Sequence, residues 1–173
     1  MSASRISAIV EDPAWKKSGV SLARLKSAAR LALVRGRDCP LPSRRRESAA
    51  QRGGGRRSYQ LALLLANDDR LRSLNAQFRG KDSPTNVLSF PAESLDGYLG
   101  DIAIALGATT REAAAAGISL EFHTLHLAVH GVLHLLGYDH IRNYEARIME
   151  RLEIAILDEL GIPNPYARAT AIR

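Results

Sequence analysis

The hydrophobic pattern divides the chain into a strand-rich first part and a helix-rich second part. Residues 5–10 alternate loosely between polar and apolar, which predicts a strand. Residues 59–66 are apolar at almost every position, which predicts a strand buried on both faces at the centre of a sheet. Two further short strands are predicted at 87–90 and 101–106, between turn residues.

Apolar residues at helical spacing predict five helices. Trp15 lies on the apolar face of the first, where it is expected to pack in the core rather than to contact a ligand. Asn67 and Ser119 are suitable N-caps for two of the others, and Gly80 and Gly161 are suitable stops. The predicted helices span residues 13–34, 68–78, 109–116, 119–136 and 143–160.

Strands come early and helices come late, without a regular βαβ repeat. This order favours an α+β fold over a doubly wound sheet. With 173 residues, of which 46% are hydrophobic, the chain suits a single domain over residues 1–173. No apolar run is long enough to span a bilayer, no signal-peptide pattern is present, and Cys39 is the only cysteine. These observations predict a cytoplasmic protein.

Positive charge is concentrated in the first third of the chain. Residues 1–58 hold 14 of the 24 Lys and Arg but only 4 of the 18 Asp and Glu. This suggests a polyanionic partner, nucleic acid first and an anionic membrane second, although a need for solubility explains a basic chain equally well. Residues 36–57 are rich in Arg and Gly and almost free of apolar residues, which predicts a flexible surface loop. A solvated insertion and an electrostatic arm for phosphates are both compatible with it.

The candidate chemistry lies in segment 130–140, which contains three histidines. His130 and His134 are four positions apart in a helical pattern, so their imidazoles lie on one face, about 6 Å apart along the axis, and can reach one ion. Gly137 lets the chain leave the helix through a left-handed residue, and the next turn can bring His140 to the same point. Three neutral nitrogen ligands without a nearby thiolate suit one zinc ion with an open fourth position, as in a catalytic site.

The pattern HxxxHxxGxxH has the ligand spacing of metzincin proteases, but one position argues against proteolysis. Those enzymes need a Glu directly after the first His as a general base, and this chain has Gly131 there. A glycine inside a helix costs about 1 kcal/mol of helix stability relative to alanine. Because of this cost, we interpret Gly131 as a position that allows the close approach of a substrate or another backbone. A phosphodiester remains suitable as a substrate, because zinc can polarise its oxygen and activate water without a carboxylate base.

Two neighbours of the histidines have open roles. Asp139 either orients a ligand or acts in catalysis, or it caps the next helix. His126 lies one turn before His130 and is compatible with a fourth nitrogen ligand, although a supporting or packing role is favoured because three ligands are already supplied. Neither residue is included among the predicted ligands.

Together these residues resemble the YbeY family, metal-dependent endoribonucleases that act as rRNA maturation factors in bacteria. Three blocks carry the resemblance: residues 130–140 match the family's histidine motif, residues 74–91 with 99–102 match its second signature, and Pro165 with Tyr166 match its ending. The resemblance covers about residues 59–166 and leaves out the Arg-rich segment.

The resemblance implies an α+β, zincin-like domain, in which a mixed sheet of about four strands packs against helices and the metal site lies on a helix of the C-terminal half. It also implies cleavage of single-stranded RNA in 16S rRNA 3′-end maturation and ribosome quality control. By the same match, His130, His134 and His140 correspond to the ligands of one zinc ion, and Arg79 corresponds to a functionally important arginine. These four residues are predicted to be catalytic. The implied partners are ribosomal or other single-stranded RNA and the small ribosomal subunit, with no membrane and no DNA.

Arg79 also has a physical rationale. It lies at a predicted helix end, ahead of a polar turn, where a guanidinium can hold a phosphate in bidentate fashion over the metal. Lys81 can supplement it. The competing explanation is a surface ion pair with Asp82, which would contribute little.

Two functional alternatives remain open from the sequence. The nucleophile is either water or the ribose 2′-OH, and attack by the hydroxyl would leave a 2′,3′-cyclic phosphate. The alternative to an enzyme is a ribosome assembly factor, without catalytic activity, whose zinc site organises a binding surface.

Overall fold

The computed structural model describes residues 4–39, 58–92 and 97–167. Its strands are β1 (Arg5–Val10), β2 (Gln60–Ala66), β3 (Val87–Pro91) and β4 (Tyr98–Ala105), and they form a four-stranded sheet in the order β1-β2-β4-β3. β1, β2 and β4 run parallel, whereas β3 pairs antiparallel with β4 at one edge. The prediction of an α+β fold with a mixed sheet of about four strands is confirmed.

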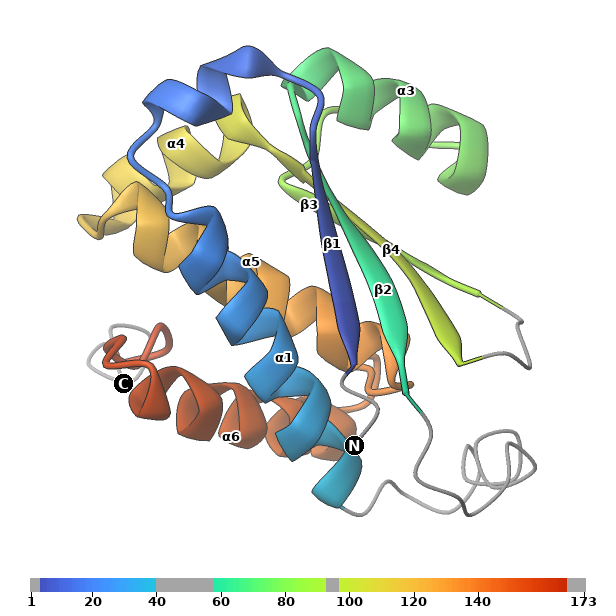
Figure 1. Ribbon diagram of the computed structural model, residues 1–173, viewed down its shortest axis with the longest axis vertical. Coiled ribbons are helices and arrows are strands. Elements are labelled where there is room, and N and C mark those ends of the chain that lie inside the picture. Colours follow the sequence, from blue (N-terminus) through green and yellow to red (C-terminus); the bar gives the residue numbers. More distant parts are fainter. Residues whose placement is uncertain (1–3, 40–57, 93–96, 168–173) are drawn as a thin grey trace.

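The helices cover the two faces of the sheet unequally. Helices α1 and α5 pack on one face with α6 behind them, and α3 lies alone on the other face (Figure 1). Helix α4 follows β4 directly at the end of the sheet. The helices are the 3₁₀ helix η1 (Pro13–Lys17) and the α-helices α1 (Leu22–Asp38), α3 (Asp68–Arg79), α4 (Leu106–Ala116), α5 (Leu120–Leu135) and α6 (Asn143–Glu159).

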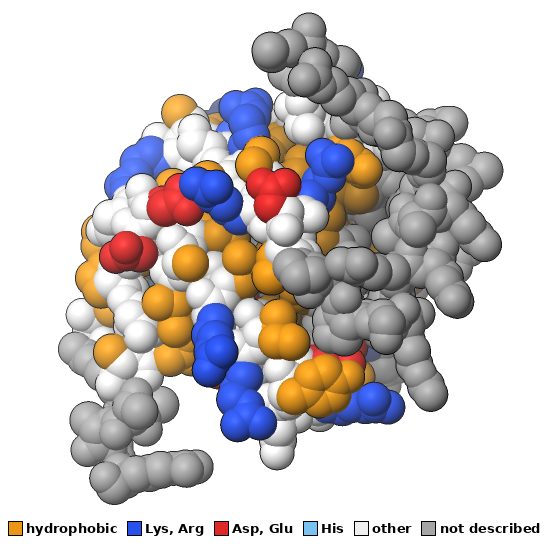
Figure 2. All heavy atoms as spheres, turned by 90° about the horizontal axis from the view of Figure 1, so that it is seen from below, with side chains coloured by type: hydrophobic (Ala, Val, Ile, Leu, Met, Phe, Trp, Pro, Cys, Tyr) orange, Lys and Arg blue, Asp and Glu red, His pale blue; other side chains and the backbone are white. Residues whose placement is uncertain are grey.

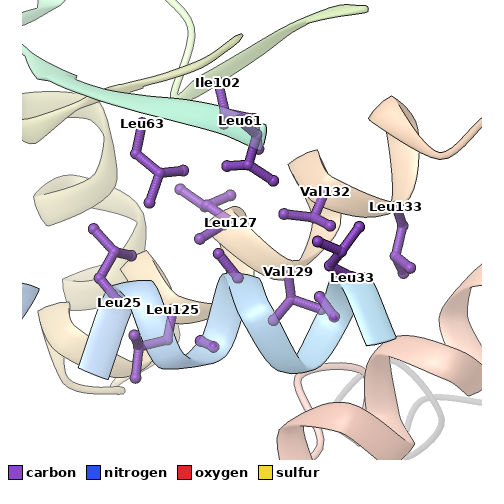
Figure 3. Close-up of a cluster of buried hydrophobic side chains, with 14 of the residues drawn as sticks. Leu25, Leu33, Leu61, Leu63, Ile102, Leu125, Leu127, Val129, Val132 and Leu133 are labelled. Carbon is purple, nitrogen blue, oxygen red and sulfur yellow. The ribbon is translucent and has the colours of Figure 1, made fainter. Parts of the chain in front are cut away.

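The main core fills the space between the sheet and helices α1 and α5 (Figure 3). Leu61 and Leu63 of β2 are fully buried there against Leu25 of α1 and Val132 of α5. Burial of each such leucine stabilises the fold by about 1.5–3 kcal/mol. A smaller cluster, which includes Leu71, joins α3 to the opposite face. β2 therefore lies centrally with apolar contacts on both faces, as its sequence predicts.

The predicted helix over residues 13–34 is wrong in its boundaries. η1 ends at Lys17, Gly19 adopts a left-handed φ of 82°, and α1 then begins after its N-cap Ser21. α1 continues through residues 36–38, which the sequence predicts as part of the loop. The glycine at position 36 lets α1 approach Leu133 and Leu136, at the end of α5, closely. The rest of the expected loop, residues 40–57, lies outside the described residues.

Helix α4 begins three residues before the predicted start at Thr109. Its own N-cap, Ala105, has no side-chain hydrogen bond, and a residue of another helix caps it instead. The Asp68 carboxylate accepts the Ala108 N–H at 2.9 Å and a hydrogen bond from Arg111 at 2.7 Å. A cap that is supplied from 40 residues away leaves no local signal in the sequence.

This distant cap predicts a pH-dependent contribution to stability. Partial burial raises the pKa of Asp68, but hydrogen bonds from Arg111 and the Ala108 N–H outweigh it and hold the pKa below 3.8. The Asp68→Asn variant keeps an oxygen that can accept the Ala108 N–H but loses the charge that binds Arg111, so it is expected to lose about 1 kcal/mol of unfolding free energy at pH 7. Because a lowered folded-state pKa stabilises only above the unfolded value, this difference should vanish as the pH falls through the folded pKa.

Urea unfolding of both proteins between pH 7 and pH 3 measures the effect. The matched control is Asp69→Asn, in the same first turn but exposed, which should change stability little. Equal losses in the two variants at pH 7 would contradict the stabilising role of the Asp68 charge.

The face at the lower end of the molecule mixes apolar, basic and neutral side chains. In Figure 2 the Lys and Arg side chains stand in several places between apolar ones, with a few acidic side chains among them. Within the described part of the chain, no helix has the length and apolar character that crossing a membrane requires.

Candidate metal centre

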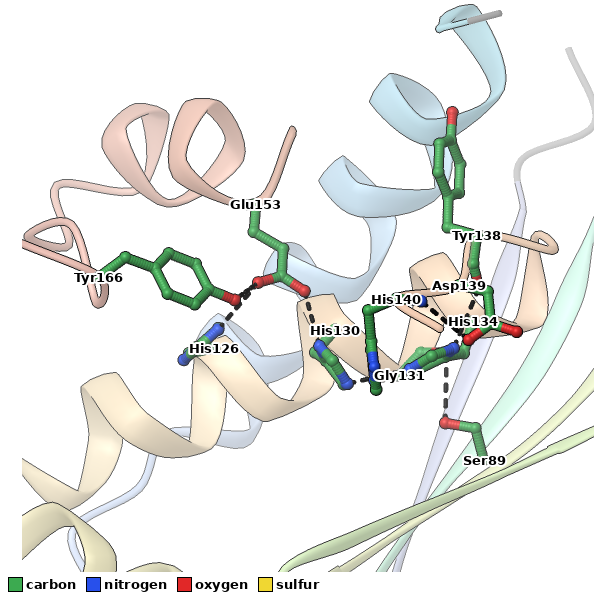
Figure 4. A network of polar contacts seen from close by, with 10 residues as sticks. All are labelled: Ser89, His126, His130, Gly131, His134, Tyr138, Asp139, His140, Glu153 and Tyr166. Carbon is green, nitrogen blue, oxygen red and sulfur yellow. Dashed lines mark hydrogen bonds and ion pairs between the residues drawn. The ribbon is translucent and has the colours of Figure 1, made fainter. Parts of the chain in front are cut away.

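Helix α5 and the turn behind it place three histidines at one point (Figure 4). α5 carries His130 and His134 one turn apart on the same side, as their spacing predicts. Gly137 has a φ of 96°, so the chain leaves the helix through the predicted left-handed residue. The next residue anchors the turn, because the Tyr138 hydroxyl donates to the Gly36 carbonyl at 2.7 Å and Tyr138 points away toward α1. His140 then folds back over the α5 pair.

The distances suit a shared ion. The ligand nitrogens of the three histidines all lie within 4.8 Å of one another. The Nε2 atoms of His130 and His134 are 3.0 Å apart, close to the roughly 3.3 Å that separates two nitrogens on one tetrahedral zinc. The His140 ring centroid lies 5.5 Å from that of His130 and 5.0 Å from that of His134. His130 and His134 are half-buried and His140 is exposed, so this group of three histidines can hold a metal ion at the surface.

Hydrogen bonds indicate which nitrogen of His130 and of His134 is available to bind a metal ion. The Nδ1 of His130 lies 2.6 Å from a Glu153 carboxylate oxygen, and the Nδ1 of His134 lies 3.0 Å from the Tyr138 carbonyl. Both oxygens only accept hydrogen bonds, so both Nδ1 atoms carry the proton and both Nε2 lone pairs face the shared point. Burial, with the nearby His130 and His140, lowers the pKa of His134 to about 4, which keeps that imidazole neutral.

Glu153 is a site residue that sequence reasoning did not find. It lies on α6, is 1% exposed, and contacts His126, His130 and Tyr166. Burial raises its pKa, but hydrogen bonds from the two histidines outweigh that effect and hold the pKa below its usual range. A signal exists in the sequence, because Glu153 shares the buried stripe of α6 with Met149, Ile156 and Leu157, where a charge is out of place.

Gly131 packs against the sheet. A Cβ at this position would lie 2.8 Å from the Cγ2 of Ile102 and 3.1 Å from the Oγ of Ser89. The close approach at this glycine is therefore by side chains of β4 and β3, and the expectation of a substrate or another backbone there is wrong. The position where zincin proteases carry their glutamate is buried and filled, which leaves no room for that general base.

Arg79 ends α3 beside the edge strand of the sheet. Its Nη2 donates to the Ser89 carbonyl at 3.2 Å, and the Ser89 Oγ donates to the Gly131 carbonyl at 3.4 Å. Ser89 thus links Arg79 to the helix that carries the histidines. The competing pair with Asp82 is not formed, because both oxygens of Asp82 bind Arg72, at 2.6 and 3.0 Å. Lys81 is exposed in the loop between α3 and β3.

The structure places both neighbours of the histidines. Asp139 is not the N-cap residue of α6, which is Arg142. The Asp139 Oδ1 instead accepts the backbone N–H of His140 at 2.8 Å, within the turn that returns the third histidine. His126 is not part of the three-histidine group, and its Nε2 lies 3.2 Å from Glu153. His126 therefore has the supporting position that the sequence analysis favoured.

Comparison with known proteins gives consistent results. The family model described as endoribonuclease YbeY matches residues 45–161. A protein of Ruegeria pomeroyi named endoribonuclease YbeY is 48% identical over 135 residues, which cover 68% of this chain and 82% of that protein. A protein of Rhodopseudomonas palustris strain CGA009 with the same name is 55% identical over 115 residues, which cover 62% of this chain. This chain spans only 60% of the length of that relative.

A solved structure shares the fold. The solution structure of a Thermotoga maritima protein matches with a TM-score of 0.50 and 23% sequence identity. The match covers 90% of this chain and 91% of the other.

Proposed function

Because the chain belongs to the YbeY family, we propose that it is a zinc-dependent endoribonuclease that cleaves single-stranded RNA. The observation that carries this proposal is the convergence of three histidine ligand nitrogens within 4.8 Å at the surface. Three nitrogens with no thiolate are the donor set of catalytic zinc sites, and the exposure of His140 leaves a side for substrate. The names of the relatives supply the reaction class.

Each residue of the site has a defined task in this proposal. His130, His134 and His140 hold the ion through neutral imidazole nitrogens. When bound, zinc would supply positive charge against the scissile phosphate and lower the pKa of a water molecule. Arg79 orients the phosphate, since the bond to Ser89 uses only one of the five N–H donors of its guanidinium. Gly131 provides no general base, which disfavours peptide hydrolysis.

We further propose ribosomal RNA as the substrate and the small ribosomal subunit as the setting, in 16S rRNA 3′-end maturation and quality control. The support is the resemblance to the YbeY family and the excess of positive charge in residues 1–58. A basic region favours binding to the phosphates of RNA, and such binding weakens as the salt concentration rises. A cytoplasmic location follows from this proposal.

Removal of the metal is the direct test. After treatment with a chelator and dialysis, cleavage of a single-stranded RNA oligonucleotide is expected to fall at least about a hundredfold, because metal catalysis supplies several kcal/mol. One equivalent of zinc per chain should restore cleavage. Circular dichroism of the stripped protein serves as the control that the fold is retained.

Undiminished cleavage by stripped protein would contradict the proposal. Stripped and reloaded protein that binds RNA equally well and never cleaves it would instead indicate the assembly factor.

A further inference from the structure

Glu153 is the buried acidic residue at the centre of the network in Figure 4. It projects from α6 toward α5, and nearly all of its surface is removed from water. A carboxylate without water is tolerated only when other groups donate hydrogen bonds to it. Among the residues that the structure describes, the imidazoles of His126 and His130 and the hydroxyl of Tyr166 form hydrogen bonds with it.

The two oxygens of Glu153 are divided between these partners. Oε2 is shared by His126, at 3.2 Å, and by Tyr166, while Oε1 lies 2.6 Å from the Nδ1 of His130. The contacts with His126 and Tyr166 hold the carboxylate in one orientation and leave Oε1 for the contact with His130, the proposed metal ligand. Burial and the charge of Glu153 raise the pKa of Tyr166, so its hydroxyl stays protonated and donates.

Tyr166 reaches this position from beyond the end of α6. The Asn164 side chain accepts the Tyr166 N–H at 2.8 Å, which turns the chain back over the helix bundle. The Tyr166 ring also packs edge-on against His126, with centroids 5.8 Å apart. The Pro165 and Tyr166 pair, which the sequence analysis matched to the family, therefore lies next to Glu153 and His126.

His130 and His134 differ in the group that accepts the hydrogen bond from Nδ1. His134 donates to a neutral backbone carbonyl, whereas His130 donates to a charged carboxylate. A carboxylate partner makes an imidazole a stronger ligand and fixes the ring orientation. His130 is therefore the ligand whose strength depends on a distant element.

We propose that Glu153, held in place by Tyr166, is a positioning residue that fixes His130 as a metal ligand and strengthens its bond to the ion. This inference rests on the proposed metal site and deepens it. It assigns the C-terminal segment a role in metal affinity.

The test measures the zinc dissociation constant by competition with a chromophoric chelator, using the full chain. Glu153→Gln keeps the size of the side chain and removes its charge, and it is expected to weaken zinc binding about 10- to 100-fold. Tyr166→Phe removes one hydrogen bond to Glu153 and is expected to weaken zinc binding about two- to tenfold. Because Tyr166 acts through Glu153, adding Tyr166→Phe to Glu153→Gln should cost much less than it does alone.

Glu112→Gln is the matched control. Glu112 contacts His123 of the same helix α5 at 2.8 Å, as Glu153 contacts His130, but His123 is outside the three-histidine group. Its zinc dissociation constant should equal that of the wild type. Circular dichroism of the metal-free proteins shows whether each variant is folded, and Tyr166→Phe provides the milder change if Glu153→Gln does not fold.

The outcomes are separable. Zinc binding by the wild type, with the same dissociation constant in the folded Glu153→Gln and Tyr166→Phe variants, would overturn this inference and leave the proposed metal site intact. Equal weakening by Glu112→Gln would also overturn it. A wild-type chain that binds no zinc would overturn the proposed function and the inference together.

Discussion

Alanine in place of His134 is expected to abolish stoichiometric zinc binding and to lower RNA cleavage at least about a thousandfold. His134 lies between the other two ligands, with its Nε2 3.0 Å from that of His130 and its ring centroid 5.0 Å from that of His140. Its removal leaves two nitrogens, of which only His130 is on α5. The measurement is the rate of cleavage of a single-stranded RNA at saturating enzyme, with zinc content determined on the same sample.

The matched control for this variant is His123→Ala. His123 is on the same helix and contacts Glu112. The variant therefore loses the same kind of side chain, at a position outside the group of three histidines. The cleavage rate of the folded variant should stay within about twofold of the wild type, since His123 lies outside the group of three histidines. A folded His134→Ala variant that cleaves at the wild-type rate would refute the catalytic role of the histidines.

The second large effect is expected from Arg79. Arg79→Ala should lower kcat/KM for RNA cleavage by about a hundredfold to a thousandfold, as does the loss of other groups that stabilise developing charge. The zinc dissociation constant should not change, because Arg79 contacts the strand beside the site and none of the three histidines within hydrogen-bond distance in the described structure. Arg79→Lys should recover only part of the activity, because an ammonium cannot bind a phosphate in bidentate fashion.

Arg70 offers a control at the opposite end of the same helix. It forms an exposed ion pair with Glu11 at 3.4 Å, and Arg70→Ala should leave kcat/KM within about twofold of the wild type. Equal losses in Arg70→Ala and Arg79→Ala would point to general electrostatic attraction of RNA rather than to a specific contact. Unchanged cleavage by Arg79→Ala would exclude its proposed role.

Local patterns predicted the ligand group and most of the fold. The spacing of His130 and His134 fixes both on one face of a helix, and a left-handed glycine at 137 allows the third to return. These are properties of a few consecutive residues, so sequence alone is sufficient for them. The same holds for the buried strand β2 and for the helix capped by Asn67, whose side chain accepts the Arg70 N–H.

Contacts between distant elements could not be predicted in the same way. The start of α4 depends on Asp68 of another helix, and the extent of α1 depends on close packing of Gly36 beneath α5. Glu153 and Tyr166 join the site through α6 and the segment behind it, 23 residues or more from His130. A buried acid on an apolar stripe indicates an unusual partner, but only the packing of α6 on α5 identifies that partner as a member of the three-histidine group.

The most direct measurement is an anomalous difference map from crystals grown with one equivalent of zinc per chain. One peak is predicted, bound by the Nε2 atoms of His130 and His134 and by a ring nitrogen of His140. Zinc bound at stoichiometric amount to other residues, with no peak among these three imidazoles, would contradict the metal centre and the function that we derive from it.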